Sequence, residues 1–308
     1  MLRKYKLECE KIVETQNNDG TIFVYMNPDE REKKTLVEGY KLDEHTLNSA
    51  LDPDEQSRLE FEDDHTAIIF KFPRNYSGGV QLIFKCGTMG VFVFKEQVIV
   101  LVSEVIDLFD GKQFMKKNTM DGVVLELIYK SIHHFLKHLK VFYLIADELE
   151  QKINKSMENK YLLNLFTLEK SAVFYLNAIN SNAVLIEKLK NNSQKLGFDQ
   201  AQLEYIDDIL IENNQCYKQA EIYSNIIASL MDARASIVSN NLNVLIKTLN
   251  VITIAIMVPT LVVSIFSMNV KLPLDQQNGT ASFCFILALA FISVVVFLFI
   301  LKRITKEH

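Results

Sequence analysis

The strongest constraint on this chain is the stretch 249–266, which is almost wholly apolar and carries no charge. A helix of about 20 apolar residues is long enough to cross the hydrocarbon core of a bilayer. Lipid offers no hydrogen-bonding partner to a polar side chain, so the positions of the few polar residues are informative. The stretch predicts a membrane-spanning helix over about 249–267.

The polar side chains of this helix follow one face. Steps of three and four residues keep positions on the same side of a helix, and the other faces here carry Ile, Val, Leu, Ala and Phe. Two interpretations fit: a seam through which helices hydrogen-bond to one another, or the wall of a water-filled path. Periodicity alone does not choose between them. The positions on this face, the polar stripe, are Asn243, Ile246, Asn250, Thr253, Met257, Thr260, Ser264 and Ser267.

A second apolar run, 281–301, predicts a second span, with an outer loop over 268–280. The first ten residues are charged and hold no apolar segment, which argues against a signal peptide. Lys247 precedes the first span, and Lys302 and Arg303 follow the second. The positive-inside rule therefore predicts a hairpin in the plasma (inner) membrane with both termini in the cytoplasm.

The rest of the composition excludes several classes of protein. The chain has 308 residues and a formal net charge of −5, enough for one sizeable soluble part beside the membrane hairpin. Cys9, Cys86, Cys216 and Cys284 are far apart, which predicts lone thiols and neither a zinc site nor a disulfide framework. No nucleophile–base arrangement is present, so we do not expect an enzyme. We also expect no nucleic-acid partner.

Residues 1–120 are predicted to form a cytosolic α/β domain. Short Val/Ile/Phe-rich runs predict strands, the last three of which we expect to pair as an antiparallel meander with a turn at Gly87. A helix is expected over 43–51, and a helical connection over 104–109. The predicted strands are 21–26, 67–72, 80–85, 91–94 and 98–102.

Residues 121–242 are predicted to form a cytosolic helical stalk, followed by the transmembrane hairpin 243–308. Apolar periodicity indicates helices over 121–158 and 162–190, and a third that begins near Asp199. No Pro or Gly occurs between Phe198 and Val258. We therefore expect one helix on the order of 100 Å long that runs into the membrane and packs against copies of itself.

The residues at the end of the first span resemble a family signature. The run FSMNV, 266–270, is similar to the Y/F-Gly-Met-Asn-F motif of the CorA family of magnesium transporters, with Ser267 in the place of the glycine. Residues 45–73 resemble the family's DP…R.E…D……F.FP stretch. Asp232 and Ser239-Asn240 resemble the residues at the cytosolic end of the family's first membrane-spanning helix. The family's N…K.L…MP.T pattern is matched, with the proline displaced by one, by Asn243, Lys247, Leu249, Met257, Pro259 and Thr260.

This resemblance implies a homopentameric funnel around a central pore for divalent cations. It assigns the selectivity filter to Ser267, Met268 and Asn269, with a ring of Asn269 amides that receives hydrated Mg²⁺ at the outer mouth. Mg²⁺ gives up its water reluctantly, so a ring of amide oxygens can bind its hydration shell. Five-fold symmetry favours a pore over a seam for the polar face. The implied partners are the bilayer, copies of the chain and divalent cations, with no other cofactor.

Two departures from the family pattern keep the identity of the ion open. Ser267 stands where glycine permits a sharp backbone turn, and Lys271 would place positive charges at the outer mouth, which Asp275 partly offsets. The alternatives to a Mg²⁺ channel are a transporter of zinc or another transition metal with the same fold, and a non-conducting, membrane-anchored regulatory homologue.

Two further groups are weighed as metal sites. The resemblance implies that Asp208, near Glu204, Asp207 and Glu212, is part of a cytosolic Mg²⁺ sensor; the alternative is a solvated acidic helix face. His134 and His138 are one turn apart, with His133 adjacent, as zinc ligands can be. Lys137 and Lys140 share that helix and no third ligand is spaced to match, so a basic surface helix is the better prediction for the histidines.

Overall fold

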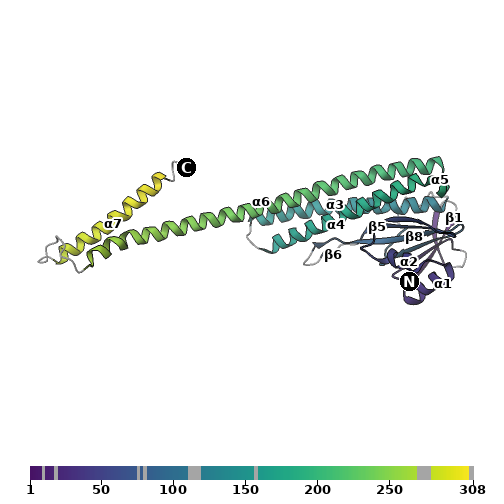
Figure 1. Cartoon of the computed structure of the whole chain (residues 1–308), viewed down its shortest axis with the longest axis horizontal. Helices are drawn as coiled ribbons and strands as arrows, with labels where there is room; N and C mark the ends of the chain where they lie inside the picture. Colours follow the sequence, from purple (N-terminus) through teal and green to yellow (C-terminus); the bar gives the residue numbers. More distant parts are fainter. Residues whose placement is uncertain are drawn as a thin grey trace. The chain divides into compact units, whose positions relative to one another are not determined.

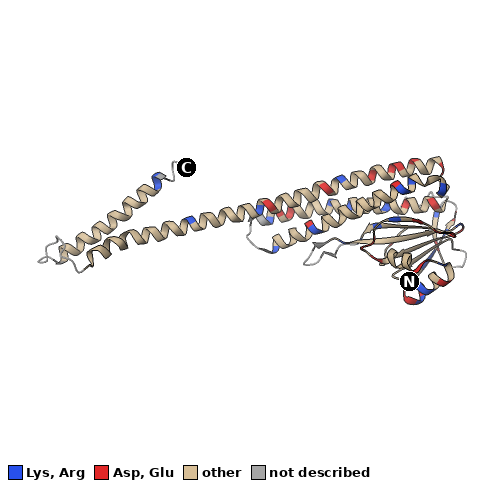
Figure 2. Cartoon of the chain, viewed as in Figure 1, with Lys and Arg blue, Asp and Glu red and all other residues tan. Residues whose placement is uncertain are grey.

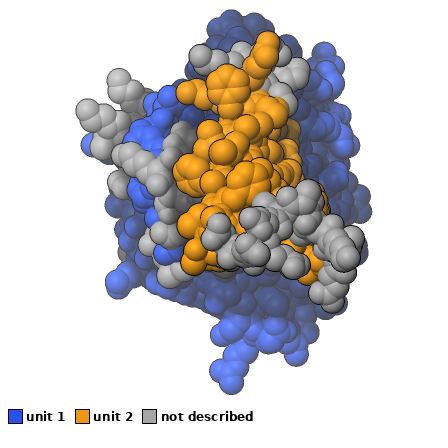
Figure 3. Space-filling model, turned by 90° about the vertical axis from the view of Figure 1, so that its left-hand side faces the viewer, with its two compact units in different colours: residues 1–231 blue, residues 232–308 orange. Residues whose placement is uncertain are grey.

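The computed structural model describes residues 1–8, 11–16, 20–74, 77–78, 82–109, 119–155, 159–268 and 279–304. The chain divides into two compact units, unit 1 (Met1–Met231) and unit 2 (Asp232–His308), coloured separately in Figure 3. The boundary falls inside helix α6, Gln200–Phe266, which therefore contributes to both units. The three-part division 1–120, 121–242 and 243–308 stays a prediction.

Unit 1 contains a seven-stranded sheet in the order β2-β1-β3-β9-β8-β5-β4. Figure 1 labels β1, β5 and β8 of this sheet. Among the described pairs, β3 and β9 are parallel and the others antiparallel. A separate pair joins β6 to β7. The bounds are β1 Leu2–Glu8, β2 Lys11–Thr15, β3 Ile22–Met26, β4 Arg58–Phe61, β5 Thr66–Pro73, β6 Ser77–Gly78, β7 Leu82–Ile83, β8 Cys86–Val93 and β9 Val98–Val102.

Helices cover both faces of this sheet because its central strands are apolar on both sides. Alternate residues of a strand point to opposite faces, and along β5 Phe70 enters one core while Ile69 enters the other. The first core also takes side chains from α3 (Met120–Lys155) and α4 (Asn159–Asn191). The second takes them from α1 (Glu30–Tyr40) and α2 (Glu44–Leu51). The predicted α/β character of the N-terminal part is confirmed.

The sequence patterns miss β1, β2, β4 and α1. In β1 the side chain of Tyr5 alone is buried and charged residues occupy both faces, so the alternation of a half-buried strand is absent. Charges of this kind are typical of strands near a sheet edge. Helix α1 buries one residue, Leu36, but Asp29 and Glu32 form a capping box at its start. That box is a readable signal in the sequence.

The predicted meander is wrong in its first strand and in the turn at Gly87, whereas β8 and β9 pair in antiparallel fashion as expected. Gly87 lies within β8, which pairs with β5 and β9, while β7 pairs with β6. Gly90 is required in β8 because α2 approaches closely: a Cβ there would lie 2.4 Å from Ala50 Cβ. The glycines of this strand thus accompany a close approach of backbone, and they do not mark a turn.

The helical connection predicted for 104–109 is also wrong. These residues follow β9 as irregular backbone. Lys130 of α3 donates hydrogen bonds from Nζ to the carbonyl oxygens of Asp107 at 3.0 Å and Leu108 at 2.6 Å. The lysine satisfies carbonyls that a helix would have bonded internally, and so it holds this connection against α3.

The long helices predicted for the second part of the chain are confirmed as α3, α4 and α6, with residues 156–158 outside the described part. A short helix, α5 (Ser193–Leu196), and Gly197 with φ of 72° separate α4 from α6. This left-handed conformation suits glycine at a helix end. Asp199 Oδ1 accepts from Gln202 N at 2.7 Å, and Gln202 Oε1 accepts from Asp199 N at 2.8 Å, which caps α6.

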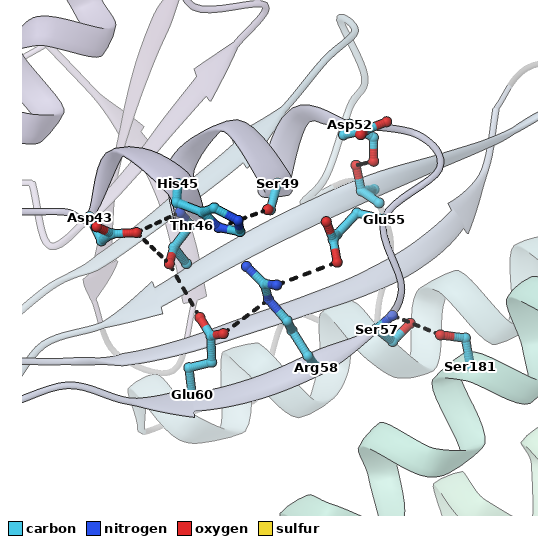
Figure 4. A network of polar contacts seen from close by, with 11 residues as sticks. Asp43, His45, Thr46, Ser49, Asp52, Glu55, Ser57, Arg58, Glu60 and Ser181 are labelled. Atoms are coloured by element: carbon cyan, nitrogen blue, oxygen red, sulfur yellow. Dashed lines mark hydrogen bonds and ion pairs between the residues drawn. The ribbon is translucent and has the colours of Figure 1, made fainter.

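A polar network connects α2 to β4, the edge strand of the sheet (Figure 4). The Arg58 guanidinium lies between the carboxylates of Glu55 at 3.4 Å and Glu60 at 3.2 Å. Glu60 also accepts a hydrogen bond at 3.3 Å from Thr46 Oγ1 on α2. At the start of that helix Asp43 accepts from Thr46 N at 2.9 Å, which satisfies an amide that the helix itself leaves free.

Asn182 of α4 takes the place of a strand partner beside β5. Pairing with β4 stops at Ile69, so the backbone of Lys71 lies beyond it. The Asn182 side chain accepts from Lys71 N at 2.8 Å and donates to Lys71 O at 2.9 Å. Its oxygen also accepts from Ser57 Oγ at 2.8 Å. Asn182 is fully buried, so water does not reach these groups.

We expect Asn182→Ala to lower the free energy of unfolding by about 3 kcal/mol, because it leaves a buried N–H and a buried hydroxyl without a partner. Denaturant unfolding of the purified chain, followed by circular dichroism, measures the change. Asn180→Ala is the matched control, since Asn180 is exposed on the same helix, and it should change stability by about 0.5 kcal/mol or less. Equal losses in the two variants would refute the role assigned to Asn182.

Candidate ion pathway

Unit 2 contains two helical segments, the last part of α6 and α7 (Gly279–Ile304), and their central parts are free of charge. Residues 248–266 and 280–301 contain no Asp, Glu, Lys or Arg. Figure 2 shows the contrast with unit 1, where both signs of charge are frequent. Both helices are long and apolar enough to cross a membrane. The two apolar C-terminal helices predicted from the sequence are therefore present.

One face of each helix in unit 2 is partly covered, and the other faces are exposed. The partly covered residues recur every three or four positions, as the residues of one helical face do. In α6 they are Val251, Ala255, Val258, Pro259, Val262 and Phe266. In α7 they include Ser282, Ile286, Leu289, Ala290, Ser293, Val294, Phe297 and Leu301.

The polar stripe predicted from the sequence lies on the opposite side of α6 from the covered face. At about 100° per residue, Thr253 and Thr260 are about half a turn away from Val262 and Val251. Each member of the stripe is exposed in the single chain: Asn243, Ile246, Asn250, Thr253, Met257, Thr260, Ser264 and Ser267. The structure therefore leaves this face available to copies of the chain or to an aqueous path.

Both threonine hydroxyl groups of the stripe donate their protons to the helix itself. Thr253 Oγ1 donates to the carbonyl oxygen of Leu249 at 2.8 Å, and Thr260 Oγ1 donates to that of Ile256 at 2.7 Å. A hydroxyl has one donor and two acceptor sites. Because the donor is used internally, what remains at these positions is oxygen lone pairs. Such oxygens can accept from the water of a hydrated cation.

Ser267 directly follows the C-terminal end of α6 without backbone strain. Ser267 N donates to the carbonyl oxygen of Val263 at 3.1 Å, and its Oγ donates to that of Ser264 at 2.9 Å. Among the described residues, the non-glycine positions with positive φ are Asn27 and Lys41. Ser267 thus extends the helical hydrogen bonding by one residue, and it does so without a left-handed backbone conformation.

The remaining outer residues named from the sequence are Asn269, Lys271 and Asp275, and they lie outside the described residues. Their roles stay predictions. Met268 lies beside them and is exposed.

In unit 1, Asp208 lies on an exposed part of α6 beside a cavity of about 200 Å³. Tyr129 of α3 and Glu212, one turn along α6, also line it. Asp207 is oriented elsewhere, since its carboxylate pairs with Lys190 of α4 at 2.5 Å. The structure therefore brings together only part of the acidic group predicted from the sequence.

Sequence analysis missed the contribution of α3 to this acidic cavity. Tyr205, which also lines it, donates from its hydroxyl to Glu126 Oε2 at 2.6 Å. Burial raises the pKa of Tyr129, as do the negative charges of Glu212, Glu126 and Asp208. Burial and the hydrogen bond to Glu126 raise the pKa of Tyr205. The local potential is thus negative, and no spacing along one helix could have indicated it because two helices supply it.

The three histidines of α3 do not form a metal site, but the prediction of a basic surface helix is wrong for one of them. His138 is buried, its Nδ1 lies 2.7 Å from the Tyr175 hydroxyl, and burial lowers its pKa to about 4. Over the described part of the chain, no group of three or more His, Cys, Asp or Glu side chains is placed to hold a metal ion. Cys86, Cys216 and Cys284 are free thiols there, and Cys9 lies outside it.

Comparison with known proteins decides the family. The model of the CorA-like Mg²⁺ transporter protein family matches residues 17–303. This chain belongs to that family. It is also 21% identical over 287 residues to the cobalt/magnesium transport protein CorA of Methanocaldococcus jannaschii, an alignment that covers 90% of this chain and 88% of the relative.

Solved structures of other proteins share this fold. The complete structure of the CorA magnesium transporter from Methanocaldococcus jannaschii matches with a TM-score of 0.82 and 18% identity, over 98% of this chain and 96% of the other. The full-length CmaX protein matches with a TM-score of 0.73 and 13% identity, over 98% and 96%. The cytoplasmic domain of ZntB from Vibrio parahaemolyticus gives 0.59 and 9%, over 77% and 98%.

Membership in the CorA-like family establishes the class of this chain. It is a membrane protein of a Mg²⁺ and divalent-cation transporter family, whose members are ion transporters or channels and not enzymes. The family and fold predicted from the FSMNV motif are confirmed. The roles of single residues in the pore, the filter and the sensor stay predictions.

Proposed function

We propose that this chain is the subunit of a homopentameric channel that carries divalent cations, Mg²⁺ foremost, through a central pore lined by α6. The observation that carries the proposal is the exposed polar stripe opposite the covered face of the helix. A symmetric ring of chains can turn that face toward its axis and leave the apolar faces to lipid and to α7. The selectivity filter is then Ser267, Met268 and Asn269.

The chemistry of the stripe favours a hydrated cation. Thr253 and Thr260 supply oxygen lone pairs because their protons are bonded to the helix, and Asn243 and Asn250 supply amide oxygens. Each stripe residue is uncharged. A ring of neutral oxygens can hold the water shell of Mg²⁺ without stripping it, and weak binding at several levels allows the ion to leave.

The proposed location is the plasma (inner) membrane with both termini in the cytoplasm. Lys302 and Arg303 end α7, and Lys247 precedes the apolar part of α6. The positive-inside rule places these basic residues on the cytoplasmic side. Unit 1 then lies in the cytosol.

Ion flux into proteoliposomes tests this function. The purified chain should admit a divalent cation down its gradient, and parallel assays with Mg²⁺, Zn²⁺, Co²⁺ and Ni²⁺ identify the ion. A preference for Zn²⁺ would select the transition-metal alternative. No flux of any of the four ions would reject a channel and select a non-conducting, membrane-anchored regulatory homologue.

We propose further that Asp208 senses cytosolic Mg²⁺. The acidic cavity that it shares with Glu212 supports this, because neighbouring carboxylates repel one another until a cation lies between them. Loss of that cation would then loosen the cytosolic assembly and open the pore. No basic side chain pairs with Asp208 in the described part of the chain.

The variant Asp208→Lys should make channel closure insensitive to cytosolic Mg²⁺, because a fixed positive charge replaces the bound ion. The measurement is flux at low and at millimolar cytosolic Mg²⁺. Glu221→Lys makes the same charge change at an exposed position of α6 away from the cavity, and it should close normally. Closure of Asp208→Lys at the same Mg²⁺ concentration as the unmodified channel would rule the sensor out.

A further inference from the structure

A cavity of about 510 Å³ in unit 1 is separate from both sites above. It lies between the irregular connection after β9 and one face of α3. Phe72 at the end of β5, Met89 of β8 and Leu127 of α3 form apolar parts of its wall. Its volume is within the range of about 300–1,000 Å³ that is usual for small-molecule sites.

A basic face of α3 forms the polar side of this cavity. Lys130, His133, His134 and Lys137 all line it, and their spacing of three and four residues places them on one side of the helix. Lys130 Nζ bonds the carbonyl oxygens of the connection and so fixes the wall. Lys137 is exposed and has no acidic partner among the described residues.

The cavity holds N–H donors, among them the charged side chain of Lys137, with few acceptors to match them. His133 Nδ1 is buried and has no hydrogen-bond partner in the described part of the chain. Burial and the charges of Lys137 and Lys130 lower the pKa of His134. The one acidic side chain among the described lining residues, Asp107, bonds Arg3 at 3.0 Å and is 76% exposed. The positive potential of this face is therefore not compensated.

We propose that this cavity binds a small organic phosphate. The phosphate group accepts from Lys137 and the two histidines, and the apolar or aromatic body lies against Phe72, Met89 and Leu127. Phosphate oxygens match clustered cationic donors, and an apolar wall excludes a bare inorganic ion as the preferred ligand. The basic face is thus a binding surface for an anion, although it holds no metal.

Three probes separate the parts of this proposal in calorimetric titrations of the purified full-length protein. Adenosine monophosphate carries both a phosphate and a ring system, adenosine lacks the phosphate, and inorganic phosphate lacks the ring. We expect adenosine monophosphate to bind at least about tenfold more tightly than either fragment. The proposal would be overturned if adenosine monophosphate did not bind, or bound no more tightly than adenosine or inorganic phosphate.

Lys137→Gln should weaken the binding of adenosine monophosphate by about tenfold or more, because it removes an unpaired donor. Lys140→Gln is the matched control, since Lys140 is exposed on the same helix and does not line the cavity. Thermal unfolding checks that both variants fold. If the two variants lose affinity equally, or if neither does, the cavity is not the site. The assay measures binding and not flux, so its outcome is independent of the proposed transport function.

Discussion

Replacing Asn269 with alanine is expected to abolish divalent-cation flux. The proposed filter binds the water shell of the ion through a ring of amide oxygens, and a methyl group cannot accept those hydrogen bonds. We expect flux to fall by at least about a hundredfold, which corresponds to about 2.7 kcal/mol of added barrier. A Mg²⁺-sensitive dye inside proteoliposomes measures the initial rate.

Asn278→Ala is the matched control for this variant. It makes the same change of residue within the same predicted outer loop, 268–280, and flux should stay within about twofold of the unmodified protein, a difference of less than 1 kcal/mol. Substantial flux through Asn269→Ala would show that another residue binds the ion at the outer mouth. Similar losses in both variants would indicate damage to the loop as a whole.

Replacing Asn250 with leucine should have the next largest effect. In the proposed pentamer this change places a ring of apolar side chains across the pore, and hydrophobic constrictions exclude water and block ions. We expect a fall of at least about tenfold in flux, equivalent to about 1.4 kcal/mol. Since Asn250 is exposed in the single chain, the substitution removes no packing within unit 2.

Ile252→Leu provides the control for the Asn250 variant. Ile252 is also exposed, but it lies away from the stripe on α6, toward the apolar sides of the helix. Flux should be unchanged when leucine replaces isoleucine there. Unimpaired flux through Asn250→Leu would mean that the stripe is a seam between helices and does not line the path.

Local patterns along the chain predicted the membrane part well. The apolar run 249–266 and the spacing of Asn250, Thr253 and Met257 are properties of a single helix, so they can be read without knowing what surrounds it. The FSMNV motif supplied the family, which periodicity could not have done. Periodicity also could not choose between a seam and a pore, because both place polar side chains on one face.

The errors in unit 1 arise where contacts distant in sequence override local preference. Gly87 was predicted to form a turn, yet it lies in β8 opposite Phe72 of β5, where a Cβ would lie 3.1 Å from the Phe72 ring. Residues 104–109 have apolar spacing that suits a helix, but Lys130 bonds two of their carbonyls. The strand β1 buries only Tyr5, so its pairing depends on β2 and β3 and not on its own pattern.

The sequence by itself determined that two apolar helices end this chain, that an unbroken helix leads into the first, and that its polar residues share a face. These features depend on residues a few positions apart. Only the tertiary structure decided that this face is opposite the covered one, that Tyr129 of α3 lines the same cavity as Asp208, and that His138 is buried while His134 lines a cavity. Burial depends on which elements meet, and that is set by contacts between residues far apart in the chain.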